Sequence, residues 1–444
     1  MAAAAATATT RIAVIGAGPL VGMQHCRAVA SMDHNVELAC VCQRRLDDTA
    51  AAEHFGVRLY TDAGEMARRE RLDGIVIAAP THLHLPLAES CIEGAKALQE
   101  ELGAPRPLLR ALLVEKPLSH DLRAAMRLVE VAEAAGIMIL VGHQRRHSSY
   151  VKRARELVTK ANFGPLRGFT AEFALLKPEG YFEKDDPRLA WRGQKGKGGP
   201  VLINMIHDVD LLRYITGHEV SSIFAATTAT ARDNEVEDTG AVTLILDHGA
   251  VGTLFFSDAT PSPWSYEFTT QENKKYPPVP GKGPKDCYHF FGAQQSLGFP
   301  SLSCFHYERA HSAEVVEPGW DAPLRVEEES VQQEDPIVVQ MAHFVRVCRG
   351  LESPLCSGRD AMESLAVILA VHRSVETQGP VCPGELFKAV VNTEQSLEGG
   401  GAGTIGTVLP AASTAAAAAQ RFPKAPMSST AYDTAGVLQS ESLF

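Results

Sequence analysis

The stretch that decides the fold is RIAVIGAGPLVGM, residues 11–23, in which an apolar run leads into a glycine-rich turn. The run predicts a buried strand, and the residues from Val21 to Met32 predict a helix directly after the turn. Glycines in such a turn let a pyrophosphate approach the unpaired N–H groups at the start of the helix. The alternative is a purely structural turn, but the order of strand, turn and helix favours a dinucleotide site.

The glycine spacing departs by one residue from the common dinucleotide fingerprint. Gly16, Gly18 and Gly22 give the pattern G-x-G-x-x-x-G, and Val21 stands where the third glycine is usual. We nevertheless expect the turn and the first helical residues to line the cofactor. The residues predicted to contact it here are Gly16, Gly18, Leu20 and Val21.

Strands and helices alternate from this turn to about residue 150, a pattern typical of parallel β-α-β units in a doubly wound α/β sheet. We therefore predict a nucleotide-binding domain with this sheet over residues 11–150, with a surface insertion at 96–110. The predicted strands are 11–15, 36–42, 75–79, 112–114 and 137–141, and the predicted helices are 21–32, 86–92 and 122–135.

The pattern changes to extended runs in residues 151–390, which predict a second, α+β domain with a largely antiparallel sheet. Residues 261–319 carry no clear pattern. The ends, 1–10 and 397–444, are rich in small residues and are expected to be disordered. The predicted strands are 169–176, 221–228, 241–246 and 251–256, with a hairpin turn at 247–250, and the predicted helices are 150–160, 201–215, 336–349 and 361–378.

Charge and cysteine content exclude several classes of protein. The formal net charge of -11 argues against a nucleic-acid binder and gives no reason to expect binding to an anionic membrane. No apolar run reaches the length that spans a bilayer. The nine cysteines lack paired metal-ligand spacing, which indicates reduced thiols and a cytoplasmic protein.

The end of the second strand predicts which nucleotide binds. An acidic residue there favours NAD, because it bonds the ribose 2′-hydroxyl. This chain instead has Arg44 and Arg45, and its first acid is Asp47. Either arginine suits a 2′-phosphate, so the sequence favours NADP(H), with NAD(H) still possible and two solvated surface arginines as the alternative.

Polar residues also follow the next two strands, at the edge where ligands bind in such sheets. Pro80, Thr81 and His84 follow one strand, and Glu115 and Lys116 follow the other. Thr81 has the alternative of capping a helix. An ammonium at this edge is suited to exchange a proton with a substrate oxygen. A salt bridge between the two adjacent residues at 115 and 116 is disfavoured, because neighbours on an extended chain point apart.

A second group of polar residues lies on a predicted helix after Gly198 and Gly199. Asn204, His207 and Asp208 lie about one helical turn apart, and a histidine there is a natural general acid or base. The alternative is a helix with solvated acids. The pair His82 and His84 lacks a nearby carboxylate or cysteine, and we predict no metal site.

Taken together, Gly16-Ala17-Gly18, Pro80 to His84, Glu115-Lys116-Pro117 and Gly198 to Asp210 resemble the motifs of the Gfo/Idh/MocA oxidoreductases, a likeness that runs from about residue 11 to 383. The resemblance implies a Rossmann domain, an open and mostly antiparallel C-terminal sheet, and a homo-oligomer, dimer or tetramer, formed through that sheet.

The resemblance also implies roles for individual residues. Lys116 matches the catalytic lysine, with a cis peptide to Pro117, and His207 matches the active-site histidine. The chain departs from the family at Ile203, where many members have an aspartate. Pro80, Thr81, His84, Glu115 and Lys116 are expected to line the cofactor.

The implied reaction is NAD(P)-dependent hydride transfer at a hydroxyl or carbonyl carbon of a sugar, polyol or inositol. The alternative is a regulatory protein that keeps the cofactor pocket but has lost chemistry. The residues expected to contact the substrate are Arg145, Tyr181, Trp191, Arg192 and Asn204.

Overall fold

The computed structural model describes residues 9–398 except 20, 46, 187–188, 282, 284 and 308–318, and it describes no side chains over 392–398. The chain up to Gln395 forms one compact unit. Leu20 and nearly all of the two terminal segments predicted to be disordered therefore lie outside the described residues.

The N-terminal half contains a six-stranded parallel sheet, as predicted. Its order is β3-β2-β1-β4-β5-β6, so the winding reverses between β1 and β4, where doubly wound sheets bind ligands. The strand β3 and the short helices before and after it were not predicted from the sequence. The strands are β1 (Thr10–Ile15), β2 (Val36–Cys42), β3 (Arg58–Tyr60), β4 (Gly74–Ile77), β5 (Ala111–Val114) and β6 (Met138–Val141).

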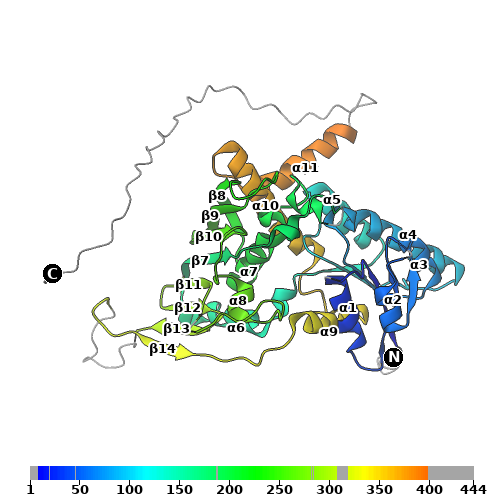
Figure 1. Ribbon diagram of the computed structural model, residues 1–444, viewed down its shortest axis with the longest axis horizontal. Helices are drawn as coiled ribbons and strands as arrows, with labels where there is room; N and C mark the ends of the chain where they lie inside the picture. The colour runs from blue at the N-terminus through cyan, green and yellow to red at the C-terminus, as the bar shows by residue number, and fades with distance from the viewer. Residues whose placement is uncertain are drawn as a thin grey trace, which may run out of the picture. The chain divides into compact units, whose positions relative to one another are not determined.

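Helices cover both faces of this sheet (Figure 1). One face carries α3 (Ala63–Arg69), α4 (His84–Glu101) and α5 (Leu122–Ala134), and the other carries α1 (Val21–Ala30) and α2 (Ala50–Phe55). The predicted insertion at 96–110 is only in part a loop. Its first six residues extend α4, and the buried side chains of Leu98 and Leu109 anchor it.

A helix from the second half of the chain completes the core of the first sheet. In α9 (Pro336–Cys348), Met341 and Phe344 are fully buried among residues of β1, β4 and β5. A Cβ placed on Gly74 of β4 would lie 2.8 Å from the Phe344 ring, which shows how closely α9 packs on the sheet. The sequence predicted this helix but not its place.

The second half contains an eight-stranded sheet of order β14-β13-β12-β11-β7-β10-β9-β8. It is mostly antiparallel, as predicted, and among its described strands β7 and β10 alone pair in parallel. The strands are β7 (Leu166–Ala174), β8 (Val220–Thr228), β9 (Thr239–Leu246), β10 (Val251–Ser257), β11 (Tyr288–Gly292), β12 (Gln295–Phe299), β13 (Ser303–His306) and β14 (Arg325–Glu328).

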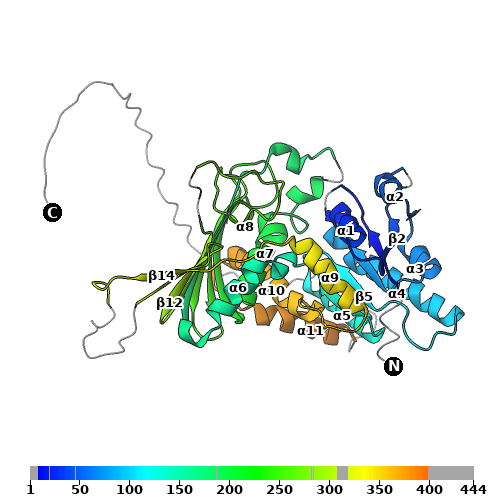
Figure 2. The same cartoon turned by 90° about the horizontal axis from the view of Figure 1, so that it is seen from below.

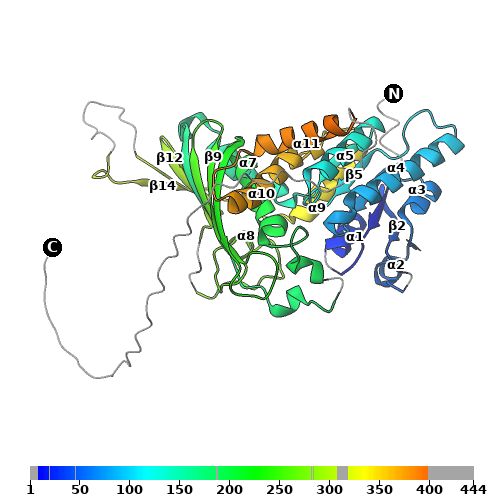
Figure 3. The same ribbon diagram turned by 90° about the horizontal axis from the view of Figure 1, so that it is seen from above.

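The helices of this half lie on one side of its sheet (Figures 2 and 3). Inward side chains alternate with exposed ones along β9 and β10, so the opposite face is covered by no described helix. Strands β11 to β13 lie in the segment that carried no clear sequence pattern. The helices are α6 (Ser149–Val158), α7 (Ile206–Thr216), α8 (Tyr266–Thr270), α10 (Gly358–Thr377) and α11 (Pro383–Glu398).

Short helical turns connect these elements and carry much of the site. None of the described helices is both long and apolar enough to cross a membrane. The turns are η1 (Thr81–Leu83), η2 (Gln144–His147), η3 (Ala161–Phe163), η4 (Glu179–Phe182), η5 (Ala190–Gly193) and the π-helical turn η6 (Val201–Met205).

Candidate functional site

The glycine turn after β1 is shaped to leave space at the start of α1. Gly16 has a φ of +79°, and a Cβ on it would lie 2.6 Å from the Ala78 carbonyl oxygen. A Cβ on Gly22 would lie 2.0 Å from the Gly16 carbonyl oxygen, so Gly22 supplies the close helix packing despite its shifted spacing. A Cβ on Gly18 would meet nothing within 4 Å, which fits a position open to a ligand. These observations make the turn suitable for a pyrophosphate.

The two predicted arginines stand on the surface just past the end of β2. Arg44 and Arg45 are both exposed, and Arg45 forms an ion pair with Asp47. Their position is the one required for contact with the adenosine ribose. Asp47, the first acidic residue after β2, is thus paired with Arg45.

Glu115 connects the end of β5 to helix α1. Its Oε1 lies 2.8 Å from Nε2 of the buried His25, and its Oε2 accepts a hydrogen bond of 3.2 Å from the Lys116 amide. Burial raises the pKa of Glu115, but the hydrogen bond and charge of His25 outweigh it, and the pKa is lowered overall. The carboxylate is therefore fixed by His25 and the Lys116 amide, and its charge also acts on the Lys116 ammonium.

Lys116 reaches from the Rossmann sheet to the C-terminal half. The peptide bond to Pro117 is cis, as the resemblance implied. The Nζ atom donates a hydrogen bond of 3.0 Å to the main-chain oxygen of Ile203 in η6. Burial is the main cause that lowers the pKa of Lys116 to about 8. Lys116 is thus hydrogen-bonded to a main-chain oxygen of Ile203, the residue at which the resemblance implied an aspartate, and its lowered pKa brings the amine nearer to neutral pH.

His84 fixes the two loops that flank Lys116. Its ring nitrogens lie 2.9 Å from the Ala79 oxygen and 3.2 Å from the Leu118 oxygen. Burial lowers its pKa, while the hydrogen bonds to the Ala79 and Leu118 oxygens act in the opposite direction. The alternative of Thr81 as a helix cap is wrong, because α4 begins at His84 and the preceding turn η1 has no side-chain cap. The side chain of Thr81 is buried.

His207 lies at the start of α7, close to Lys116 and Arg145. Burial is the main cause that lowers its pKa well below the ordinary value, and the charges of Lys116 and Arg145 add to the shift. Its Nδ1 has no hydrogen-bond partner among the described residues. A neutral imidazole is therefore held beside a titrating lysine, as a hydrogen-bonding group rather than a second cation.

Two adjacent arginines of η2 form hydrogen bonds with the two aspartates of α7. Arg145 donates to Asp208 at 3.3 Å and to Glu267 at 2.8 Å. Arg146 donates two hydrogen bonds, of 2.8 and 2.7 Å, to the two oxygens of Asp210. Both aspartates are almost fully buried, so the alternative of a helix with solvated acids is wrong. Arg145, which was predicted to contact substrate, is engaged by carboxylates through both terminal nitrogens, while its Nε has no hydrogen-bond partner among the described residues.

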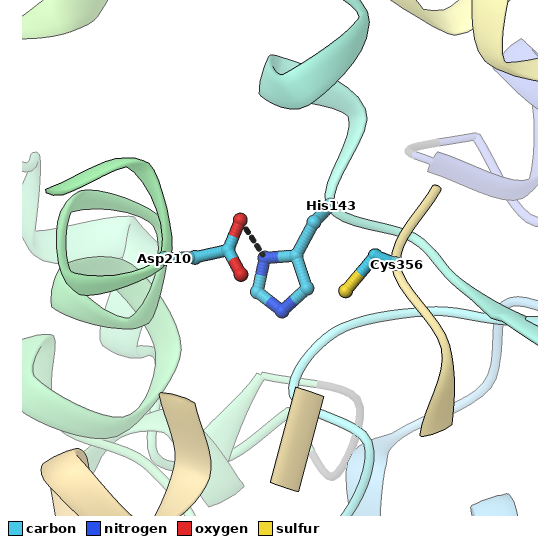
Figure 4. Close-up of side chains that lie close together, drawn as sticks. All are labelled: His143, Asp210 and Cys356. Atoms are coloured by element: carbon cyan, nitrogen blue, oxygen red, sulfur yellow. Dashed lines mark ion pairs between the residues drawn. The ribbon is translucent and has the colours of Figure 1, made fainter. Parts of the chain in front are cut away.

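Behind His207 lies a buried group of His143, Asp210 and Cys356 (Figure 4). The Nδ1 atom of His143 is 3.4 Å from Asp210, and its ring meets the His207 ring edge-on at a centroid distance of 6.2 Å. These are metal-ligand residue types, but both Asp210 oxygens already accept from Arg146. Burial raises the pKa of the Cys356 thiol, which disfavours a thiolate. We assign this group a structural role.

A lysine that the sequence reading missed brings the predicted substrate residues together. Lys177, just after β7, donates from Nζ to Oδ1 of Asn204 and lies 4.5 Å from the ring centroid of Tyr181. The guanidinium of Arg192 lies 4.1 Å from the same centroid. Trp191 is partly buried beside Arg192, 5.8 Å from its guanidinium. Four of the five residues predicted to contact substrate thus lie in one group with Lys177, apart from Arg145. We call this group the substrate wall: Lys177, Tyr181, Trp191, Arg192 and Asn204.

Three residues of the site were not singled out from the sequence. His25 lies in a predicted helix, His143 directly follows a predicted strand end, and Lys177 follows another. The edge rule for parallel strands pointed to the position of His143. Nothing comparable pointed to the other two, whose partners are distant in sequence.

Family models match two parts of the chain. Residues 10–143 match the oxidoreductase family with an NAD-binding Rossmann fold, and residues 151–273 match the GFO/IDH/MocA C-terminal domain. The two matches together cover more than half of the chain and adjoin near the domain boundary expected from sequence.

Curated relatives and solved structures agree with these models. The chain is 26% identical over 252 residues to a myo-inositol 2-dehydrogenase of Thermotoga maritima, covering 55% of this chain and 67% of that one. It is 26% identical over 239 residues to the rhizopine catabolism protein MocA of Rhizobium meliloti, covering 53% and 67%. The WlbA dehydrogenase of Bordetella pertussis, solved with NADH and UDP-GlcNAcA, superposes with a TM-score of 0.63 at 22% identity over 84% of this chain and 98% of that one, which shows the shared fold.

Proposed function

This chain belongs to the Gfo/Idh/MocA family of oxidoreductases, and we propose that it moves a hydride between a nicotinamide cofactor and the carbon of a hydroxyl or carbonyl group on a sugar, polyol or inositol. The observation that carries the proposal is the position of Lys116. Its amine stands at the carboxyl edge of the NAD-binding sheet, 3.0 Å from the Ile203 oxygen and beside a neutral His207.

In the oxidation direction, the Lys116 amine accepts the proton of the substrate hydroxyl as the carbon gives up its hydride. A nicotinamide, when bound, supplies the acceptor for that hydride. With a pKa of about 8, the amine is present in both protonation states near neutral pH and serves the reverse direction as an acid. The imidazole of His207 orients the same oxygen by a hydrogen bond.

The cofactor preference we propose is NADP(H), while NAD binding is a property of the family's Rossmann domain. The support is the exposed Arg44 and Arg45 beyond β2. The pairing of Arg45 with Asp47 leaves Arg44 as the better candidate for the 2′-phosphate. Gly16, Gly18 and Val21 would hold the pyrophosphate, with Thr81 and Pro80 closer to the nicotinamide.

We also propose that the open face of the C-terminal sheet joins two or four copies of the chain. That face carries half-exposed apolar side chains and a hollow of about 490 Å³. Exposed apolar surface of this kind marks protein contacts. The side chains are Phe224, Ile245, Val251, Phe255, Phe291 and Phe305.

A reducing location, the cytoplasm, is proposed from the thiols. All nine cysteines are free, and eight of them are buried. Burial raises the pKa of most of these thiols and makes them unreactive.

The test is turnover of NADP⁺ and NAD⁺ with a panel of inositols, sugars and polyols, followed by absorbance of the reduced nicotinamide. Lys116→Ala should lower turnover by about 10²- to 10⁴-fold, while cofactor affinity measured by calorimetry changes little. Turnover of the variant within a few-fold of wild type would contradict the role of Lys116.

The same panel tests a second candidate, a cofactor-binding regulatory protein. The observation in its favour is Ile203, which replaces an acid found in many relatives. Cofactor binding without turnover of any panel member would support this candidate.

A further inference from the structure

The wall around Lys177 is built from hydrogen-bond donors and positive charge. We define the Lys177 cluster as the residues that contact this lysine or share its partners: Lys177, Tyr181, Arg192, Asn204, Arg232 and Asp258. It holds three cations and one carboxylate. Asp258 lies 3.4 Å from the Lys177 ammonium and is bound more tightly by Arg232, which bonds both its side chain and its main-chain oxygen. One carboxylate therefore serves two cations.

Two ammonium groups converge on neighbouring residues of the π turn η6. Lys116 Nζ binds the Ile203 oxygen, and Lys177 Nζ binds the side-chain oxygen of Asn204. The Asn204 oxygen already accepts from Lys177, and both N–H groups of its amide remain to donate to a partner. Asn204 and Lys116 are partly exposed, whereas Lys177 is almost fully buried. The Lys177 cluster thus presents hydrogen-bond donors and more cations than carboxylates, while the carboxylates of Glu115, Glu267 and Asp208 act on Lys116 itself.

We propose that this cluster binds a carboxylate of the substrate, so that the enzyme prefers sugar acids to the neutral sugars or polyols of the same shape. The inference deepens the proposed function and rests on it. A carboxylate has acceptor oxygens only, and it matches a surface of donors better than a hydroxyl, which must also place its own hydrogen. The buried Lys177 shares its one anion, Asp258, with Arg232, so a second carboxylate from a ligand would complete its charge pairing.

The test uses matched pairs that differ only in a carboxylate: glucuronate with glucose, and galacturonate with galactose. Wild-type enzyme should turn over the acid of a pair with at least about tenfold higher kcat/KM. Lys177→Met should remove that preference, mainly by raising KM for the acid. Lys177→Arg should keep it. Lys184→Met is the matched control, because Lys184 is an exposed lysine paired with Asp233 outside the cluster.

Two checks keep the outcomes separate. Asp258 retains Arg232 in Lys177→Met, so we expect the variant to fold, and thermal melting measures this. Calorimetry of each sugar and acid with the cofactor-loaded enzyme measures binding without turnover. Preference in binding without turnover would overturn the proposed dehydrogenase function and support the carboxylate site. Turnover or binding with no preference for the acid, or a Lys177→Met effect equal on both members of a pair, would overturn the carboxylate site.

Discussion

The cofactor edge and the substrate wall of this site are built in different ways. At the cofactor edge, Gly16, Gly18 and Gly22 lie within seven residues and act by leaving out side chains. At the substrate wall, and at the neighbouring pair of Arg146 and Asp210, charged side chains meet from separate segments of the chain, 64 positions apart in that pair. The first region depends on volume and the second on charge, so each should be sensitive to a different kind of substitution.

The largest effect should follow loss of charge at the seam between the two halves. Arg146→Met leaves the buried Asp210 without its bidentate partner, which typically costs about 3–5 kcal/mol of folding free energy. Denaturant unfolding measures this. Arg359→Met is the control, because its pair with Glu133 is exposed and screened by solvent, so its loss should change stability little. Equal losses in the two variants would show that burial of the first pair is irrelevant.

The next effect concerns pH and the lysine that stands where the two regions meet. Oxidation needs the neutral amine of Lys116, whose pKa is lowered to about 8. The rate of oxidation should therefore rise with pH up to about 8 and fall about tenfold per unit below it. The pH profile of kcat/KM measures this limb. A profile flat between pH 6 and 8 would assign the proton to another group.

A smaller effect should follow added volume at the cofactor edge. Gly22→Ala places a carbon 2.0 Å from the Gly16 oxygen, so α1 must shift, at a cost of about 1–3 kcal/mol in stability and with weaker cofactor binding. Gly18→Ala meets nothing in the chain and should weaken cofactor binding while leaving the melting temperature unchanged. Melting curves with and without cofactor measure both. A lower melting temperature in Gly18→Ala alone would reverse the assignment of the two glycines.

The smallest effect should follow removal of the Arg44 charge at the cofactor edge. Arg44→Ala should weaken NADPH binding about tenfold and leave NADH binding unchanged, because the arginine is exposed and its pairing with phosphate is screened. Calorimetry with both nucleotides gives the ratio. If both affinities change alike, Arg44 does not read the 2′-phosphate.

The same difference explains what the sequence could predict. Apolar runs and the glycine turn specified β1, β2, β5 and α5 almost to the residue, because local burial and turn geometry suffice there. The short strand β3 was missed, since three residues with one arginine carry no periodicity. Strands β11 to β13 were missed because they lie in a segment rich in Pro and Gly, and because β11, on which the other two build, pairs with β7 more than 100 residues earlier.

Within the site, Lys116 and His207 were found because strand ends and helix faces position them locally. Lys177 was missed, because its meaning comes from Asn204, 27 positions away, and from the shared carboxylate of Asp258. His25 was missed for the same reason, since its partner Glu115 is 90 positions away. Charges at long sequence separation are assigned only by tertiary structure.

The packing of α9 on the first sheet has a consequence for how the protein is made. The six strands are complete once Val141 has been synthesised, but the face that receives Met341 and Phe344 stays open until α9 emerges. At about 5–20 residues per second, a ribosome needs roughly 10–40 s to add those intervening residues. During that interval the nascent Rossmann sheet exposes an apolar face, so chaperone binding to the growing chain should be strongest between these two points.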